Sequence, residues 1–305
     1  MITLKKIREL DLSASAAPER ASYLSAASGL VRAGSFLYVV ADDELHLGVF
    51  RTTDNGPGHL IRLFEGELSA SKPERKKQKP DLETLTLLPP SEKFPNGAIL
   101  ALGSGSKRNR RMGALLRLDE HGAVRGSPEP VDLSPIFAPL DGAFPALNIE
   151  GAVVVNDEMR LFQRGNKRDS ENAIIRFPLS PFLGTLNVGR ESAIEPLAIN
   201  RIELGRIDGI PFCFTDAAAL PNGDMVFTAV AEDTDDAYND GPCAAAAIGI
   251  AGSDGHLRRL LRLDAPYKVE GVDARVEGDV IRLLLVTDAD DPEIPAALFS
   301  ATMDR

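Results

Sequence analysis

Five oxygen-bearing side chains recur at nearly even intervals, each at the start of a short apolar segment. They are Ser28, Glu83, Glu150, Thr215 and Glu270, and successive members are 55, 67, 65 and 55 residues apart. Glu150 and Glu270 begin the closely related sequences Glu-Gly-Ala and Glu-Gly-Val. One structural repeat per interval gives such spacing. The sequence therefore predicts five repeats, and their equivalent side chains would meet at one centre if the repeats close into a ring.

Three carboxylates that converge on one centre repel one another, and removal from water adds to that cost. A cation among them is therefore expected. Calcium fits best, because it takes about six to eight oxygen ligands in irregular geometry and accepts both carboxylates and neutral oxygens. Magnesium demands a tighter octahedron, and zinc prefers His or Cys, whereas the four histidines lie off the repeat frame. The five repeated residues are the predicted calcium ligands. Internal ion pairs with Arg or Lys are the alternative.

The elements that must position these residues are short strands joined by tight turns. In the fourth repeat we expect strands over 215–220, 225–230, 244–250 and 257–263, with a hairpin turn at Pro-Asn-Gly-Asp, residues 221–224. The fifth repeat ends at 297–303 and lacks a fourth strand. The segment 2–10 alternates loosely between apolar and charged residues and is free to supply that strand.

Pairing of the two chain ends would close the ring and remove the exposed strand edges of an open array. The predicted fold is thus an all-β, five-bladed β-propeller. It forms one domain over residues 1–305, with blades starting near 28, 83, 150, 215 and 270. Six blades would require splitting the longer intervals, and a doubly wound sheet would need helical segments of about ten or more residues between strands. The basic segment 72–80 is expected to be a loop.

Composition limits the function classes. Charged residues make up 26% and hydrophobic residues 44% of the 305 residues, with 26 Gly, 21 Pro and no Trp, as in soluble, turn-rich globular chains. The net charge of −11 argues against general nucleic-acid binding. Charges interrupt the first eight residues, where a signal peptide would need a continuous apolar region, so we expect a cytoplasmic protein with no membrane association. The two cysteines lack zinc-site spacing.

Four stretches carry a resemblance to a known family. They are Ser28-Gly29-Leu30-Val31, Lys79-Pro80-Asp81-Leu82-Glu83, Thr215 to Pro221 ahead of Asn222-Gly223-Asp224, and Tyr267-Lys268-Val269-Glu270-Gly271. In this order they resemble the blade starts of the calcium-activated nucleotidase (apyrase) family. As a pattern of short motifs, the resemblance spans nearly the whole chain. Phytase-like and uncharacterised bacterial propellers have similar Glu-Gly-Leu blade starts.

The resemblance implies a five-bladed propeller with calcium in its central channel, bound by a Ser, Glu, Glu, Ser, Glu-like series. Thr215 would replace a serine of that series, which preserves the oxygen. Asp42 and Asp43, which follow the second strand of the first repeat, look like the acidic pair of that family. The secretory or anchor segment of the family is absent and its nucleotide-holding loops have no match here. The resemblance therefore supports the prediction of calcium binding more strongly than the prediction of a nucleotide substrate.

The loops expected around the ring are locally basic on an acidic protein. Their cations are Lys72, Arg75, Lys76, Lys77, Lys79, Lys107, Arg108, Arg110, Arg111, Arg164, Lys167 and Arg168. With a metal beneath it, such a face suits a small anionic molecule such as a phosphate ester. Acidic residues, among them Glu232 and Asp288, occupy the corresponding loops of the fourth and fifth repeats. A mixed, solvated rim is therefore the alternative.

The leading hypothesis is a calcium-dependent hydrolase of a phosphate ester or anhydride, in which the metal polarises the phosphoryl oxygen and orients a water. Asp42 or Asp43 would be the general base. The developing charge would be neutralised by arginines, for which the candidates are Arg108, Arg111, Arg164 and Arg168. The alternative is a non-catalytic propeller with a structural calcium that binds a small anionic ligand or a protein partner. The fold does not choose between them.

Overall fold

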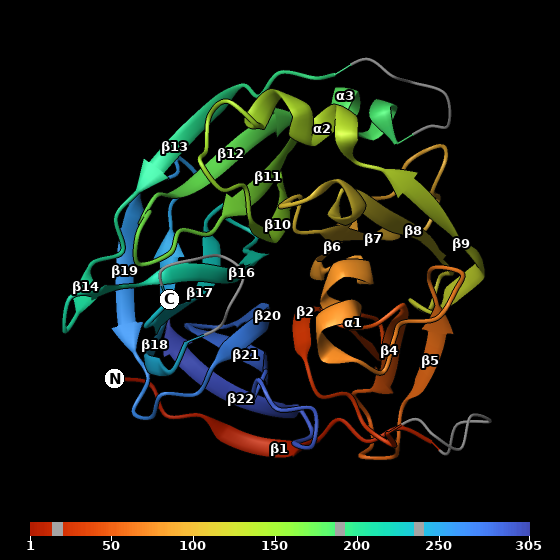
Figure 1. Ribbon diagram of the computed structural model, residues 1–305, viewed down its shortest axis with the longest axis horizontal. Coiled ribbons are helices and arrows are strands. Elements are labelled where there is room, and N and C mark those ends of the chain that lie inside the picture. Colours follow the sequence, from red (N-terminus) through yellow and green to blue (C-terminus); the bar gives the residue numbers. More distant parts are fainter. Residues whose placement is uncertain (14–20, 187–192, 235–240) are drawn as a thin grey trace.

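The computed structural model describes residues 1–13, 21–186, 193–234 and 241–305. Five four-stranded antiparallel sheets stand around a central channel, as Figure 1 shows in a view down that channel. The first strand of each sheet lies nearest the centre and the fourth lies at the rim. The predicted all-β, five-bladed propeller is confirmed.

The bounds of the strands follow the five predicted repeats. The first blade holds β2 (Ala27–Ala33), β3 (Phe36–Ala41), β4 (His46–Arg51) and β5 (His59–Arg62), and the second holds β6 (Leu82–Leu88), β7 (Ala98–Gly103), β8 (Met112–Leu118) and β9 (Val124–Asp132). The third holds β10 (Ile149–Val155), β11 (Glu158–Gln163), β12 (Asn172–Pro178) and β13 (Ala198–Ile202), and the fourth holds β16 (Cys213–Ala219), β17 (Met225–Glu232), β18 (Cys243–Ala251) and β19 (Leu257–Arg262). A small hairpin, β14 (Arg206–Ile207) with β15 (Ile210–Pro211), connects the third and fourth blades.

The fifth blade joins the two ends of the chain. It contains β20 (Val269–Glu277), β21 (Val280–Thr287), β22 (Ala297–Asp304) and the N-terminal β1 (Lys5–Glu9). β1 pairs antiparallel with β22, with Lys5 opposite Ser300 and Glu9 opposite Ala297. The predicted ring closure by the N-terminal strand is thus confirmed. It covers the outer edge of β22, which would otherwise be exposed for pairing.

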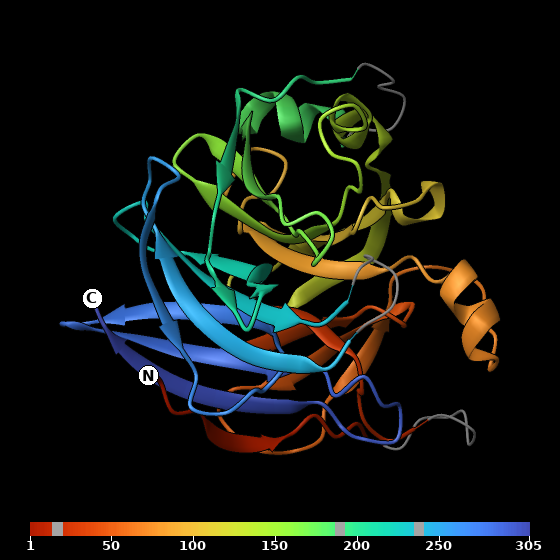
Figure 2. The same ribbon diagram turned by 60° about the vertical axis from the view of Figure 1, so that its left-hand side comes forward.

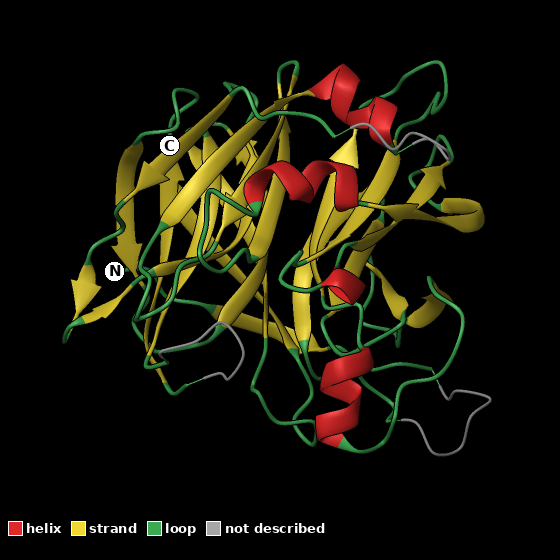
Figure 3. Cartoon of the chain, turned by 45° about the horizontal axis from the view of Figure 1, so that its top comes forward, coloured by secondary structure: helices red, strands yellow, loops and turns green. Residues whose placement is uncertain are grey.

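Short helices lie outside the sheets, as Figures 2 and 3 show. The expected basic loop at 72–80 is a helix over most of its length, α1 (Lys72–Gln78), with a proline in its first turn, where a missing amide proton costs no hydrogen bond. α1 projects from one end of the propeller. The others are η1 (Arg108–Arg110), α2 (Ser134–Phe137), η2 (Ala138–Leu140) and α3 (Leu179–Thr185). Among the described residues, no helix is long and apolar enough to cross a membrane.

The blades hold together through apolar layers between neighbouring sheets. Between the third and fourth blades, the rings of Phe162, Phe214 and Phe227 are fully buried and meet edge to face, with centroid distances of 5.1 and 4.9 Å. Edge-to-face contact places the positive ring edge on the negative ring face. α2 and α3 add Phe137 and Phe182 to the layer between the second and third blades. This packing fixes the blades and therefore the inner strands.

Each inner strand contains an irregularity at the residue that the repeat analysis singled out. The register between first and second strands shifts at Ala27/Leu30, Leu82/Thr84, Ile149/Gly151, Phe214/Asp216 and Val269/Gly271. The residues within these shifts are the five of the predicted ring and, in the first blade, Gly29 as well. A bulge inserts an unpaired residue and re-aims its side chain, and bulges are frequent next to active sites. The register therefore supports the repeat alignment independently of residue type.

Glycines follow the ring residue in three blades because the inner strands approach closely there. A Cβ on Gly271 would lie 2.6 Å from the carbonyl oxygen of Ser28, and one on Gly29 would lie 2.7 Å from the amide nitrogen of Leu85. These neighbours are backbone atoms, which cannot turn away as a flexible side chain can. The glycines thus allow the narrow channel.

We expect Gly271→Ala to lower the free energy of unfolding by about 1–3 kcal/mol, because the added methyl group overpacks against backbone. Gly142→Ala is the matched control, since a Cβ there would meet nothing within 4 Å. Urea denaturation measures both. Equal stability of the two variants would contradict the close approach of β20 to β2.

Candidate functional site

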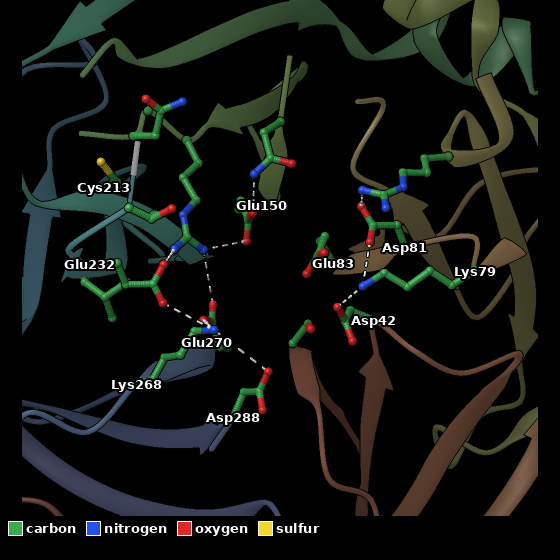
Figure 4. Close-up of a pocket in the computed structure, with 18 of the residues that line it drawn as sticks. Asp42, Lys79, Asp81, Glu83, Glu150, Cys213, Glu232, Lys268, Glu270 and Asp288 are labelled. Carbon is green, nitrogen blue, oxygen red and sulfur yellow. Dashed lines mark hydrogen bonds and ion pairs between the residues drawn. The ribbon is translucent and has the colours of Figure 1, made fainter. Parts of the chain in front are cut away.

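One end of the channel holds a cavity of about 80 Å³ whose wall is mostly charged. Figure 4 shows side chains from all five blades directed into it. The carboxylates of the wall are Asp42, Asp81, Glu83, Glu150, Glu232, Glu270 and Asp288, and the cations are Lys76, Lys79, Arg110, Arg164 and Lys268. With every group ionised, seven carboxylates against five cations give a formal surplus of two negative charges.

Four of the five predicted ring residues line this cavity: Ser28, Glu83, Glu150 and Glu270. Thr215 is buried at the equivalent position, but its hydroxyl donates to the carbonyl oxygen of Val269 at 2.7 Å. Thr215 therefore ties the fourth blade to the residue before Glu270. Thr215 thus occupies the ring position of its repeat, but its hydroxyl group bonds the backbone of the fifth blade and does not line the cavity.

Arg164 neutralises one side of the ring. Its guanidinium lies 2.5 Å from a carboxylate oxygen of Glu232, 3.4 Å from Glu150 and 3.9 Å from Glu270. Asn148 also donates to Glu150 at 2.6 Å. The three surrounding carboxylates raise the pKa of Arg164 well above its usual value against the lowering effect of burial. On this side of the ring, the carboxylates are neutralised by an arginine of the chain itself, which was the alternative to a bound cation.

Lys268 neutralises the adjacent side. Its ammonium lies 2.5 Å from Asp290, 3.2 Å from Glu232, 3.6 Å from Glu270 and 3.9 Å from Asp288. Glu232 and Glu270 thus contact both Arg164 and Lys268. Breaking such a buried network by removing one partner leaves an uncompensated charge, which costs about 3–5 kcal/mol.

A third cluster surrounds Asp81 on the side of the first and second blades. Asp81 accepts from Arg110 at 2.6 Å and from the hydroxyl of Ser104 at 2.6 Å, and it lies 2.9 Å from the ammonium of Lys79. Lys79 also pairs with Asp42. Asp81 therefore has partners for both of its oxygens.

Glu83 differs from the other ring carboxylates. Single carboxylate oxygens of Glu83, Asp42 and Asp81 lie within 4.8 Å of one another. Within the described part of the chain, Glu83 forms no ion pair and its carboxylate accepts no hydrogen bond. Burial raises the pKa of Glu83 well above its usual value, and the charge of Glu150 adds to that effect. The space between Glu83 and Glu150 is thus where positive charge is lacking.

The predicted catalytic residues lie at different distances from the cavity. Asp42 and Arg164 line it. The Asp43 carboxylate lies 3.8 Å from Arg75, and burial together with the charge of Asp42 raises its pKa to about 6. Arg111 forms a two-pronged pair with Asp141. Arg108 and Arg168 are exposed.

The sequence contained a signal for several cavity residues that repeat analysis alone did not select. Alternate residues of a strand point to the same side. The position two before each ring residue therefore also faces the cavity, and Asp81, Asn148, Cys213 and Lys268 all stand there and line it. Burial raises the pKa of the Cys213 thiol to about 11, so it is neutral at pH 7.

A second set comes from the ends of the second strands. Asp42, Arg164 and Asp288 directly follow β3, β11 and β21 and reach the cavity from above the ring. Much of the cavity wall therefore comes from three equivalent positions of the blades, and no single position is filled by a lining residue in all five blades. The side chains at those positions differ from blade to blade, which gives the wall its charge pattern.

The buried carboxylates make stability depend on pH. Burial raises the pKa of Glu150 from 4.5 to about 7 and that of Asp288 from 3.8 to about 8. Between the ordinary and the raised values the folded state binds more protons than the unfolded state. Without a divalent cation, we therefore expect the free energy of unfolding to fall as pH rises from 5 to 8, by at most about 1.4 kcal/mol per pH unit for each group.

Urea denaturation in the presence of a chelator measures this slope. Glu150→Gln should reduce it, whereas Glu65→Gln, at an exposed position, should leave it unchanged. A stability that rises across the same pH range would contradict the uncompensated burial of these carboxylates.

Comparison with solved structures supports the architecture. The chain is similar to a luciferin-regenerating enzyme with a TM-score of 0.51 and 11% identity, covering 99% of this chain and 95% of that one. It is similar to the catalytic domain of a Coprinopsis cinerea GH62 α-L-arabinofuranosidase with a TM-score of 0.54 and 10% identity, covering 99% and 96%. A Bombyx mori GH32 β-fructofuranosidase in complex with sucrose gives 0.50 and 10%, covering 95% of this chain and 61% of that one. At these identities the likeness extends to the fold alone.

Comparison by sequence gives a family. No curated protein matches the chain. One family model matches residues 23–303, which span the propeller from just before the first blade to the last strand. The chain therefore belongs to DUF6929, a family of unknown function.

Proposed function

We propose that this protein is a calcium-dependent hydrolase that acts on a phosphate ester or anhydride at the mouth of the channel. The observation that carries the proposal is the Glu83 carboxylate, which has no ion pair within the described residues, beside Glu150 in a cavity lined by seven carboxyl groups and five cations. The wall of the same cavity supplies cations for an anionic substrate. The resemblance of the blade starts to the apyrase family, and more distantly to phytase-like propellers, agrees with this combination.

The donor set fits calcium. Ser28, Glu83, Glu150 and Glu270 offer a hydroxyl and three carboxylates, all of them oxygen donors. Calcium accepts such a mixture in irregular geometry and completes its shell with water. A divalent cation would also cancel the surplus charge of the cavity wall. Glu150 forms an ion pair with Arg164, whereas Glu270 pairs with both Arg164 and Lys268. We therefore assign Ser28, Glu83 and Glu150 as the principal ligands and Glu270 as a weaker or water-mediated one.

Thr215 departs from the ligand series of the resembling family, because its hydroxyl proton is donated to Val269. Its contribution to a metal would come through water or through the position of Glu270. Threonine at this position therefore keeps the hydroxyl oxygen, but the hydroxyl group is directed at the Val269 carbonyl.

Cations on the wall could hold the phosphoryl group. Lys76 and Lys79, from the segment between the first and second blades, and Arg110, from η1, line the cavity. Figure 4 shows Lys79 across the cavity from Lys268. Arg110 donates to the backbone carbonyl of Lys76 at 3.2 Å, so η1 and α1 are fixed to each other. Fixed cations stabilise developing negative charge without reorganisation during the reaction. Among the predicted arginines, Arg164 keeps this role, and Arg110 replaces Arg108 and Arg111 because it reaches the cavity.

Calcium would supply Lewis-acid polarisation of the phosphoryl oxygen and a bound water. Asp42 would act as general base toward the attacking water, and its position in the cavity wall beside Glu83 supports this role. Lys79 pairs with Asp42, and this ion pair orients the carboxylate that would act as general base. Asp43 faces Arg75 and supports the turn that carries Asp42.

One observation favours a second candidate function, a non-catalytic propeller with a structural calcium. The cavity of about 80 Å³ accommodates an ion with a few waters more readily than a large substrate. In that case the channel mouth would bind a small anionic ligand or a protein partner. Turnover measured together with calcium binding separates the two functions.

Calcium should stabilise the protein through Glu83. We expect the free energy of unfolding to rise by about 2.7 kcal/mol at free calcium of about one hundred times Kd, and Glu83→Gln to remove most of this increase. Glu65→Gln, which changes an exposed residue, should retain it. Thermal unfolding with calcium and with chelator provides the measurement. An equal calcium response in wild type and Glu83→Gln would remove Glu83 from the site.

Hydrolysis should require both calcium and Asp42. With p-nitrophenyl phosphate and a nucleoside diphosphate as substrates, we expect turnover with calcium, none with chelator, and a roughly 100- to 10,000-fold lower kcat in Asp42→Asn, the usual range for loss of a general base. Asp279→Asn, in the exposed turn between β20 and β21, is the control. No turnover of either substrate, alongside intact calcium stabilisation, would favour the non-catalytic propeller.

A further inference from the structure

The inner strands leave one set of backbone groups without a partner in the sheets. Each first strand pairs with the second strand of its blade on one side only, and its other edge faces the channel. Amide groups on that edge have no strand to bond with. Buried backbone donors without a partner are costly, so another group is expected to satisfy them.

The layer directly below the ring is narrow and almost without side chains. Its residues, one position after each ring residue, are Gly29, Thr84, Gly151, Asp216 and Gly271. A Cβ on Gly151 would lie 3.0 Å from the amide nitrogen of Ala217, and those on Gly29 and Gly271 would meet backbone even closer. Asp216 is therefore the one charged side chain of this layer, and it is fully buried.

Asp216 binds a channel-edge amide of the neighbouring blade. Its Oδ2 accepts the amide of Val272 in the fifth blade at 2.8 Å. The backbone amides of Leu30 in the first blade and of Ala217 in its own strand also favour its ionised form, against burial, which raises its pKa. Each of these amides belongs to the residue two positions after a ring residue: Glu270, Ser28 and Thr215 respectively.

A structural carboxylate of this kind is usually paired with a cation. Within the described ranges, no lysine or arginine forms an ion pair with Asp216, and its Oδ1 has no hydrogen-bond partner of good geometry. The Glu150 carboxylate acts on it from above, which raises the pKa of Asp216 further. The Val272 amide is therefore the group that contacts the Asp216 carboxyl group in this layer.

We propose that Asp216 is a positioning residue for the metal-binding ring. By holding the Val272 amide, two residues beyond Glu270, it ties the inner strand of the fourth blade to that of the fifth and fixes the bulge that carries Glu270. This inference rests on the proposed calcium site. It extends that site to a residue that contacts no ligand atom and that the repeat pattern of oxygen-bearing residues does not include.

Calorimetric titration of the intact protein with Ca²⁺ tests the proposal. Asp216→Asn keeps the shape of the side chain and removes the charge and one acceptor, and Asp216→Ala removes all contacts. We expect both to weaken Ca²⁺ binding by about 10- to 100-fold, the range found for residues that orient metal ligands, with the larger effect in Asp216→Ala. Asp273→Asn changes another largely buried carboxylate of the inner layer, three residues beyond Glu270, and should bind Ca²⁺ as wild type does.

Wild-type affinity in a folded Asp216→Ala would overturn the inference and leave the proposed function standing. A wild-type protein that binds no Ca²⁺ would overturn both. Equal weakening in the Asp216 variants and in Asp273→Asn would also contradict the inference, because general destabilisation would then explain the loss.

A measurement on the wild-type protein covers the case in which the variants do not fold. The inference predicts a cross-hydrogen-bond coupling between the Val272 amide nitrogen and the Asp216 carboxyl carbon in deuterated protein. It also predicts slow hydrogen exchange of the Leu30 and Val272 amides. Absence of the coupling together with fast exchange at both positions would overturn the inference without any variant.

Discussion

Mutual repulsion of buried carboxylates is the constraint on which this structure depends. Bulges on five inner strands aim side chains at one end of a narrow channel, and the wall there carries seven carboxylates. Like charges at such range raise one another's pKa unless cations intervene. Arg164 and Lys268 relieve the third, fourth and fifth blades, and Lys79 with Arg110 relieves Asp81. Within the described residues Glu83 has no ion pair, whereas Glu150 has Arg164 at 3.4 Å, so the chain supplies least positive charge around Glu83.

The charge distribution in the channel is asymmetric although the backbone is nearly fivefold symmetric. The backbone is nearly fivefold, with the same bulge in each blade, whereas the side chains at the equivalent positions are hydroxyl, carboxylate, amide, thiol, ammonium and guanidinium. A symmetric frame thus brings unlike groups together. One half of the ring is filled by internal cations and the other half is open to an external one. The same cationic groups that hold the wall together also face any anion that enters.

The fold and the ring followed from sequence for a simple physical reason. Strand length, turn residues and the even spacing of Ser28, Glu83, Glu150, Thr215 and Glu270 are local properties, and ring closure by residues 2–10 follows from the missing strand in the last repeat. The helix α1 was not anticipated because its basic composition resembles a loop, and α2 and α3 are too short to show a helical period. The direction of the Thr215 hydroxyl depends on the backbone of another blade, which no local pattern encodes.

The sequence alone also does not predict which lysines and arginines point into the cavity. Lys79, Arg110 and Lys268 were visible as charges, but which of them turn inward depends on strand pleat and on the bulge. The sequence does not predict the role of Asp216 for a similar reason, since its carboxylate binds the Val272 amide, which is distant in sequence and adjacent only in the folded ring. The family match leaves the chemistry open, so the charge distribution of the cavity is the strongest guide to function.

An anomalous difference map of crystals grown with calcium tests the central claim most directly. The account predicts one peak in the channel, in contact with Glu83 and Glu150 and with Ser28 nearby, while Arg164 and Lys268 keep their ion pairs. A channel without a peak, with Glu83 paired to Lys79 instead, would contradict it.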